Sequence, residues 1–473
     1  MRVSGLLLAF PLLLAASGEQ AAARQASVMV ARPPFASLDE AGRFAQVPGY
    51  VGAIFRDGRV VEAFAAGAAD CDGTGRIDAN AAFEIGSISK QVTAVALLKL
   101  WEQGRVDLDA PVGRYLDDIP AAWRAVTLRQ LLTHTSGVPD YEEAGGYGVY
   151  ETSPTRQQVF AIVAGRPLDF EPGSRWSYSN TGYFLLSLVV ERVSGMHFGD
   201  YLRARVFAPL GMTHSFMSGY APRGVSITQG CRPVGDHFVR VRPISEASTY
   251  GAGGILSTLA DWALWDDALR DGRLLSPRAM TQMRTPQRLT GGESSGYGFG
   301  LFLDNYRGVE RIDHSGQTQG FTAEYESYPS RGTAVLVLTN SYGGGVEALA
   351  SALALRAMPD LSYDAIAAPT DPDPQRTANA RRAVRQFVLG ETPQDLLDPN
   401  MIAAAADPAR AGRLVRLRGA ASVERFVYLR TLSEPGAAIE RRLYRAGAGQ
   451  TGSYFVVGWG ADGKVHGLRW FAE

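Results

Sequence analysis

The first clear alternation of apolar and polar residues begins at Gly49. Residues 49–55 (GYVGAIF) and 59–67 (RVVEAFAAG) have the pattern of a half-buried β-hairpin, with Asp57 and Gly58 in its turn. Strand-like segments return late in the chain, at 297–305, 320–329 and 332–340. Helical patterns fill the region between. We therefore predict one antiparallel sheet, built from both ends of this region and packed against a helical layer.

A second region follows a segment that has no regular period. Residues 366–378 (IAAPTDPDPQRTA) are rich in Pro and Asp, which predicts a linker after a main domain at 24–365. Beyond it, a helical pattern covers about residues 379–416, and four strand-like segments follow. We predict that residues 379–473 form a small α+β domain of unknown role.

Residues 1–23 have the pattern of a secretory signal peptide. Arg2 provides a positive start, and residues 6–16 (LLLAFPLLLAA) are apolar but too short to span a bilayer as a helix. Ala21 to Ala23 offer an A-x-A cleavage site. An uncleaved membrane anchor is the alternative. We predict a periplasmic or secreted protein whose mature form has no membrane span.

The chain has two cysteines, Cys71 and Cys231. Export permits a disulfide bond between them, and two buried free thiols are an equal alternative because the sequence gives no distance. Two cysteines cannot form a disulfide scaffold or a four-cysteine zinc site. The histidines outside the motifs below are scattered without metal spacing, so we predict no metal.

The charges of the chain nearly cancel, since 47 Lys and Arg face 48 Asp and Glu. This balance argues against nucleic-acid binding, which needs a basic surface. Only three of the basic residues are lysines: Lys90, Lys99 and Lys464. A lysine matters in such a chain because it can lose its proton and act as a base, whereas arginine cannot.

One of these lysines follows a serine by three residues. The segment from Ser87 to about Gly104 is helical and apolar on most faces, so we expect a buried helix. Ser87 and Lys90 share one face of it. Burial lowers the pKa of a lysine, and a neutral amine beside a hydroxyl is a way to activate a nucleophile. A lysine that reaches the surface is the alternative.

Two further groups of polar residues lie beside predicted elements, one before a helix and one at the edge of a strand. Tyr178, Ser179 and Asn180 stand before a helical pattern, and His314 begins the sequence HSG at a strand edge. Taken singly, Tyr178 fits a core aromatic residue and Asn180 fits a helix N-cap.

Taken in order, S-x-x-K, Y-x-N and H-S-G resemble the signatures of the serine β-lactamase and penicillin-binding protein superfamily, in its class C β-lactamase-like branch of esterases and D-aminopeptidases. Segments 128–141, 206–217 and 251–265 are similar to that family, so the resemblance covers about residues 40–357. It implies an α+β fold of the β-lactamase/transpeptidase type. Such a fold has an antiparallel sheet flanked by helices, an all-helical subdomain and no cofactor.

The resemblance also implies a role for each catalytic residue. Ser87 would attack an acyl carbon and form an acyl-enzyme, with Lys90 and Tyr178 as the proton-transfer pair. Which of the two is the base stays open, because their ionisations are coupled. Asn180 would bond to Lys90 or to the substrate amide, and His314 would lie near Tyr178 and tune it.

The backbone N–H groups of Ser87 and Gln317 would form the oxyanion hole. Gly316 would leave that strand edge free for the substrate. We expect His134, in LLTHTSG, to order a loop beside the site.

The third motif predicts the substrate class. Histidine replaces the lysine that would bind a substrate carboxylate, and it is mostly neutral near pH 7. We therefore predict cleavage of esters or of D-amino-acid amides and peptides rather than efficient β-lactamase activity. An arginine from elsewhere could restore the cation, so a β-lactamase or D-Ala-D-Ala carboxypeptidase is the alternative.

Two other interpretations compete with this one. Residues 292–296 match G-x-S-x-G, but no apolar strand precedes them and no helix follows, so we expect a loop. A penicillin-binding sensor with little turnover is the non-enzymatic alternative. In each case the partner is a small molecule or a peptide.

Overall fold

The computed structural model describes residues 47–472 except 58, 147, 153, 236, 344–345, 363–367, 390, 407–425, 434–438 and 447–452. The signal-peptide prediction and the predicted start of the main domain lie outside these residues. The described chain divides after Ala357 into two compact units. No helix in the described part is long and apolar enough to cross a membrane.

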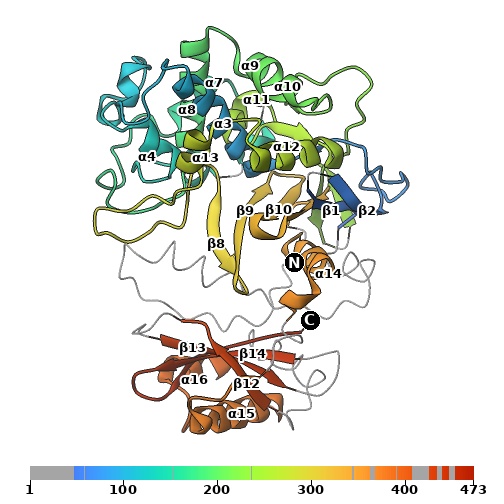
Figure 1. Ribbon diagram of the computed structural model, residues 1–473, viewed down its shortest axis with the longest axis vertical. Coiled ribbons are helices and arrows are strands. Elements are labelled where there is room, and N and C mark those ends of the chain that lie inside the picture. The colour runs from blue at the N-terminus through green and yellow to red at the C-terminus, as the bar shows by residue number, and fades with distance from the viewer. Residues whose placement is uncertain are drawn as a thin grey trace. The chain divides into compact units, whose positions relative to one another are not determined.

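The first unit is built on a six-stranded antiparallel sheet with the strand order β2-β1-β11-β10-β9-β8 (Figure 1). Its strands are β1 (Gly49–Arg56), β2 (Arg59–Gly67), β8 (Phe302–Tyr306), β9 (Val309–Gln317), β10 (Thr322–Tyr328) and β11 (Thr333–Thr339). The early hairpin joins the late strands through the pairing of β1 with β11. The predicted α+β fold with one antiparallel sheet built from both ends is confirmed.

One predicted strand starts later than expected. Residues 297–305 were expected to be extended throughout, but β8 begins only at Phe302. The preceding residues turn instead, since the Gly298 N–H donates to the Leu301 carbonyl. Gly300 has φ +73°, and a Cβ there would lie 2.6 Å from the Gln91 backbone nitrogen. This turn packs directly on the central helix, and the periodicity of the sequence does not reveal such a contact.

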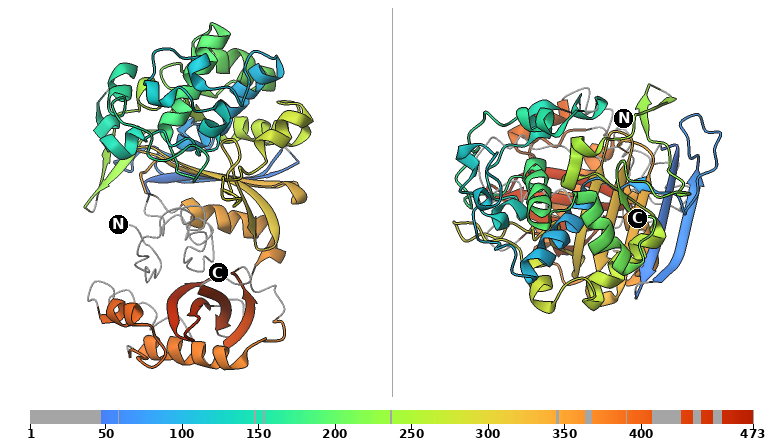
Figure 2. Two further views of the ribbon diagram at one scale, coloured as in Figure 1. Left: turned by 90° about the vertical axis from the view of Figure 1, so that its left-hand side faces the viewer. Right: turned by 90° about the horizontal axis from the view of Figure 1, so that it is seen from above.

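Helices cover both faces of the sheet (Figure 2). The long ones are α3 (Ser89–Glu102), α8 (Asn180–Ser194) and α12 (Leu259–Asp271) on one face and α14 (Val346–Ala357) on the other. The helix α3 is buried along nearly its whole length and follows a 3-10 turn at Gly86–Ile88. It ends at Glu102, close to the expected Gly104, which has φ +69°.

Shorter elements complete this unit. The helices are α4 (Leu128–Leu132), α5 (Tyr141–Gly145), α6 (Gly148–Glu151), α7 (Arg156–Ala161), α9 (Phe198–Leu202), α10 (Ala208–Leu210), α11 (Glu246–Thr249) and α13 (Pro277–Met283). Small sheets are formed by β3 (Phe83–Glu84), β7 (Ile255–Ser257) and β4 (Phe216–Met217), and by β5 (Cys231–Val234) with β6 (His237–Arg240). The G-x-S-x-G match at 292–296 lies in a loop between α13 and β8, as expected.

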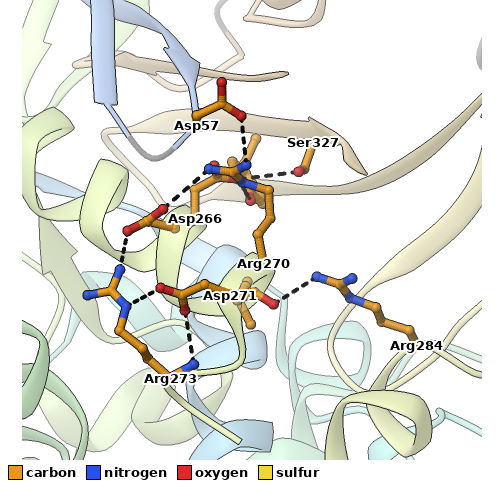
Figure 3. A network of polar contacts seen from close by, with 10 residues as sticks. Asp57, Asp266, Arg270, Asp271, Arg273, Arg284 and Ser327 are labelled. Atoms are coloured by element: carbon orange, nitrogen blue, oxygen red, sulfur yellow. Dashed lines mark hydrogen bonds and ion pairs between the residues drawn. The ribbon is translucent and has the colours of Figure 1, made fainter. Parts of the chain in front are cut away.

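An arginine-rich network fastens the first hairpin to α12 (Figure 3). Arg270 contacts Asp57, in the β1–β2 turn, and Asp266, each at 3.3 Å. Asp266 also accepts hydrogen bonds from the hydroxyls of Tyr325 at 2.7 Å and Ser327 at 3.2 Å. Burial raises the pKa of this carboxyl, against the effect of its hydrogen bonds. Arginine serves here as a fixed charge that ties elements together.

Cys71 and Cys231 form a disulfide bond, with 5.6 Å between their Cα atoms. This decides between the two alternatives that the sequence left open. The Cys231 N–H donates to the carbonyls of Gly320, at 3.3 Å, and Asn340, at 3.1 Å. The bond therefore links the loop after β2 to the ends of β10 and β11 in the main sheet.

The second unit contains α15 (Pro374–Leu389), α16 (Pro399–Ala406) and the antiparallel sheet β12-β13-β14-β15. The strands are Phe426–Thr431, Ile439–Ala446, Ser453–Gly460 and Val465–Ala472, in agreement with the four expected segments. The helical stretch is not continuous, because Pro393 and Pro399 interrupt the pattern between the two helices. Its end, at 407–416, lies outside the described residues. The helix α15 begins within the segment interpreted as a linker.

Candidate active site

Ser87 lies in the 3-10 turn between β3 and α3, directly against β9. A Cβ at Gly86, where φ is +52°, would lie 2.4 Å from the Gln317 backbone nitrogen. A Cβ at Gly316 would lie 1.9 Å from the Ile85 carbonyl oxygen. Gly316 is therefore needed for the close approach of two backbones, a requirement that the sequence did not predict. Its expected role in leaving the edge free for substrate stays a prediction. The approach brings the N–H groups of Ser87 and Gln317 to the same corner.

The edge of β9 is open at this corner. The strand β8 pairs with β9 only as far as Asp313. The residues that follow on β9, from His314 to Gln317, pair with β10 on their other side. Ser315 and Gln317 line a cavity there. This part of β9 therefore borders the cavity without pairing to β8.

Lys90 is fully buried, and its ammonium nitrogen has three oxygen neighbours. Nζ lies 3.0 Å from Ser87 Oγ, 2.7 Å from Asn180 Oδ1 and 2.8 Å from the Ala252 carbonyl oxygen. The amide and carbonyl oxygens can only accept, so they take both N–H groups of a neutral amine. The lone pair of that amine then faces the hydroxyl of Ser87.

Burial lowers the pKa of Lys90 to about 7, while the negative charges of Glu142 and Asp140 act in the opposite direction. No carboxylate contacts Nζ directly among its three partners. The neutral amine is therefore populated near neutral pH. This agrees with the expectation of a buried lysine that has lost its surface-like pKa.

Asn180 is the first residue of α8, and its amide is held from both ends. Its Nδ2 donates to Asp140 Oδ2 at 3.1 Å and to Glu142 Oε2 at 2.7 Å, so its oxygen must point to Lys90. The N-cap of the helix is Ser179, whose hydroxyl accepts from the Gly182 N–H. The alternative role of Asn180 as an N-cap is therefore wrong.

Tyr178 lies over Lys90, with 4.6 Å between Nζ and the centre of its ring. The ring of His134 packs against it at 4.3 Å between centroids. His134 Nδ1 accepts from the Ser179 N–H at 3.1 Å, and its carbonyl accepts from the Ser177 N–H at 2.9 Å. As expected, His134 orders the loop that carries Tyr178.

His314 is buried beside these rings, and its ring centre lies 6.2 Å from that of Tyr178. Its Nδ1 lies 2.6 Å from the Ser315 carbonyl oxygen, which can only accept, so a neutral ring carries its proton there. Nε2 then accepts from the Tyr297 hydroxyl at 3.0 Å. The sequence analysis missed Tyr297, which follows the G-x-S-x-G match.

A cavity of about 470 Å³ opens onto these groups. Its lining residues are Ser87, Asp140, Glu142, Glu143, Trp176, Tyr178, Asn180, Phe302, His314, Ser315 and Gln317. The lining includes three carboxylates and no arginine or lysine. The acidic residues were also missed, although Asp140 lies within the family-like segment at 128–141 and Glu142 and Glu143 directly follow it.

A family model described as Beta-lactamase matches residues 36–358, most of the chain. The chain belongs to the β-lactamase family. It is 30% identical over 279 residues to penicillin-binding protein 4* of Bacillus subtilis, with 55% of this chain and 61% of the relative covered. It is 28% identical to a D-aminopeptidase of Cereibacter sphaeroides, with 67% and 61% covered. Esterase EstB of Burkholderia gladioli is 28% identical, with 65% and 89% covered.

Solved structures of two other proteins have a similar fold. D-Amino acid amidase from Ochrobactrum anthropi, complexed with D-phenylalanine, has a TM-score of 0.59 at 26% identity, and the match covers 69% of this chain and 99% of the amidase. The octameric penicillin-binding protein homologue from Pyrococcus abyssi has a TM-score of 0.60 at 22% identity, with 94% of both chains covered. The match spans about three fifths of the length of the first curated relative.

Proposed function

We propose that this protein is an exported serine hydrolase that forms an acyl-enzyme on Ser87 and cleaves esters or amide and peptide bonds. The observation that carries the proposal is the buried Lys90 amine, 3.0 Å from Ser87 Oγ, with its other two neighbours being carbonyl-type oxygens. Such an arrangement gives a serine a base at neutral pH. The pattern of residues 1–23 supports export.

The reaction proceeds in two steps. Ser87 Oγ attacks the acyl carbon while its proton passes to the pair formed by Lys90 and Tyr178, and the N–H groups of Ser87 and Gln317 stabilise the oxyanion. The tetrahedral intermediate then collapses, and the leaving group takes the proton from the same pair. In the second step water attacks the acyl-enzyme, and the carboxylic acid and free Ser87 are released.

The charge of the cavity favours one class of substrate. Asp140, Glu142 and Glu143 line it. The third motif has a histidine, His314, in place of a lysine, and this histidine is hydrogen-bonded to the Tyr297 hydroxyl. A negative wall attracts the ammonium of a free D-amino-acid amide or peptide and repels the carboxylate of a penicillin. The D-aminopeptidase and amidase relatives support the same preference, and the esterase relative supports cleavage of simple esters.

A panel of three chromogenic substrates tests the proposal. A p-nitrophenyl ester, a D-alanyl p-nitroanilide and a chromogenic cephalosporin are compared on the wild type and on Ser87→Ala, with intact-mass detection of acyl adducts. We expect turnover of the ester or the anilide, slow turnover of the cephalosporin, and no adduct on Ser87→Ala. Efficient cephalosporin hydrolysis would favour the β-lactamase alternative. One equivalent of adduct without turnover would favour a penicillin-binding sensor.

The role of the acidic wall has its own matched test. N-acetylation of the D-alanyl anilide removes the positive charge and leaves the scissile bond unchanged. Because a charge-assisted hydrogen bond contributes about 1.5–3 kcal/mol, kcat/KM is expected to fall by about 10- to 100-fold. Equal kcat/KM values for the two anilides would contradict recognition of the ammonium.

A further inference from the structure

Tyr250 has a backbone conformation that tyrosine rarely adopts. Its φ is +42° and its ψ is −131°, a region that favours glycine at the first central position of a type II′ turn. The residue is fully buried. It does not line the cavity at Ser87. A strained backbone persists only where the surroundings force it, so the contacts of the side chain are informative.

The side chain of Tyr250 is anchored on every side. Its ring packs between Phe184 and Phe198, with centroids 5.4 and 5.5 Å away, and the Arg156 guanidinium lies 5.0 Å from its centre. Its hydroxyl donates to Glu191 on α8. Arg156 bonds to the other oxygen of this carboxylate at 2.7 Å. These contacts fix the ring against α8 and hold the backbone in the strained turn.

The turn delivers two carbonyl groups to the central helix α3. The Gly251 carbonyl accepts from the Thr93 hydroxyl at 2.7 Å, and the Ala252 carbonyl accepts from Lys90 Nζ at 2.8 Å. A Cβ at Gly251 would lie 2.7 Å from the Ser187 Cβ, so the turn is also pressed onto α8. A small rotation of this segment would move the Ala252 oxygen away from the amine.

We propose that Tyr250 is a positioning residue for the hydrolase reaction: its anchored ring forces the turn that aims the Ala252 carbonyl at Lys90. The inference rests on the proposed function. With the Ala252 and Asn180 oxygens in place, both N–H groups of the neutral amine are used and its lone pair faces Ser87. If the Ala252 oxygen moves away, the Lys90 amine can rotate, and its lone pair no longer points at the Ser87 hydroxyl. Acylation then slows, whereas substrate binding does not change.

Two substitutions of Tyr250 distinguish the contribution of its ring from that of its hydroxyl. Glycine at this position can adopt the same φ without strain but has no ring, so Tyr250→Gly keeps the turn accessible and frees it to move. Tyr250→Phe keeps the ring and loses only the hydroxyl, with its bond to Glu191 and the bond that it accepts from Arg156 at 3.3 Å. Tyr220→Phe is the matched control, because Tyr220 gives its hydroxyl to His197 in the same polar cluster, at 2.9 Å, and lies outside the turn.

The readout is single-turnover acylation of Ser87 by a p-nitrophenyl ester, with KM and thermal unfolding measured on the same samples. We expect Tyr250→Gly to slow acylation by about 10- to 100-fold, Tyr250→Phe by a few-fold, and Tyr220→Phe to match the wild type, all with KM within about twofold. A purely structural role would change the unfolding temperature without this split between rate and KM.

Folded Tyr250→Gly protein that acylates at the wild-type rate would overturn the inference. If that variant does not fold, Glu191→Gln takes its place, because it weakens the hydroxyl anchor and keeps the ring. A few-fold loss of acylation rate at constant KM, as for Tyr250→Phe, is then expected, and a wild-type rate in both variants would again overturn the inference. A wild type that forms no adduct on Ser87 would overturn the proposed function itself, which is a different result.

Discussion

Lys90 and Arg311 are two buried basic side chains of the same unit with opposite surroundings. Lys90 is fully buried among a hydroxyl, an amide oxygen and a carbonyl oxygen. Arg311, on β9, is also buried, but it meets both oxygens of Asp304, at 2.9 and 2.6 Å, and Glu326 at 3.2 Å. Burial is similar at the two sites, and the partners differ.

The partners decide the charge. Burial alone lowers the pKa of both groups. At Arg311 the charges of Asp313, Glu326 and Asp304 outweigh burial and hold the pKa well above its usual value, whereas at Lys90 the pKa falls to about 7. Arginine thus holds a permanent charge among carboxylates at one site, whereas at the other site one of the three lysines of the chain is buried with no carboxylate among its three partners.

The largest effect on activity is expected when Lys90 is replaced by a base that cannot lose its proton. Lys90→Arg places a permanent cation near Ser87, and arginine cannot give a neutral base. We expect kcat/KM for a p-nitrophenyl ester to fall by about 10²- to 10⁴-fold, the contribution of general base catalysis. Arg311→Lys is the matched control and should keep kcat/KM within about threefold of the wild type. Substantial activity in Lys90→Arg would show that the amine is not the base.

The converse substitution tests the second site. Arg311→Met leaves the buried Glu326 and the half-buried Asp304 without their cation. Since breaking a buried ion pair costs about 3–5 kcal/mol, we expect a loss of that size in the free energy of unfolding in urea. Arg311→Lys should lose less, because it keeps the charge. A loss below about 1 kcal/mol in Arg311→Met would contradict the role of Arg311 as the required counter-charge.

The pH dependence sharpens the comparison on a finer scale. A protonated Lys90 cannot accept a proton, so kcat/KM for a neutral ester should rise with pH through about 7 and level off above it. The charge of Glu142 raises the pKa of Lys90, so Glu142→Gln should lower it. The rising limb then moves to lower pH, by about 1 unit or less. A shift to higher pH would have the wrong sign for this account.

The smallest effect is expected at the exposed contact between Asp57 and Arg270 (Figure 3). Asp57 is largely exposed, and exposed ion pairs contribute about 0–1 kcal/mol. Asp57→Asn, which tolerates the positive φ of 47° at this residue, should therefore change the free energy of unfolding by no more than that and leave kcat/KM unchanged. A larger loss of stability would contradict a small contribution of this exposed pair to the network.

Much of the catalytic region follows from local features of the sequence. Ser87 and Lys90 share a helix whose apolar faces already predict burial, and the rarity of lysine singles out Lys90. The order of Tyr178, Asn180 and His314 then indicates the family. These features lie within short segments, so periodicity and spacing are sufficient to find them. The roles assigned to these residues stay predictions until the variants are measured.

The parts that escaped prediction depend on contacts between distant segments. Tyr297 reaches His314 only because the chain turns at Gly300 against α3. The requirement for Gly316 arises from the Ile85 carbonyl, more than 200 residues earlier in the chain. Asp140 accepts hydrogen bonds from both the backbone N–H and the side-chain amide of Asn180, 40 residues later in the chain. Such contacts depend on how distant segments pack together, and the sequence pattern around each residue does not reveal them.

Lys90 should lose its proton near neutral pH, so that much of it is an uncharged amine there. With only three lysines in the chain, lysine labelled with ¹³C at its ε carbon gives few signals, and Lys90→Arg identifies the one of interest. The account predicts that this signal titrates near pH 7 in the free protein. A Lys90 signal that stays in the ammonium form up to the ordinary lysine pKa of about 10.4 would contradict it.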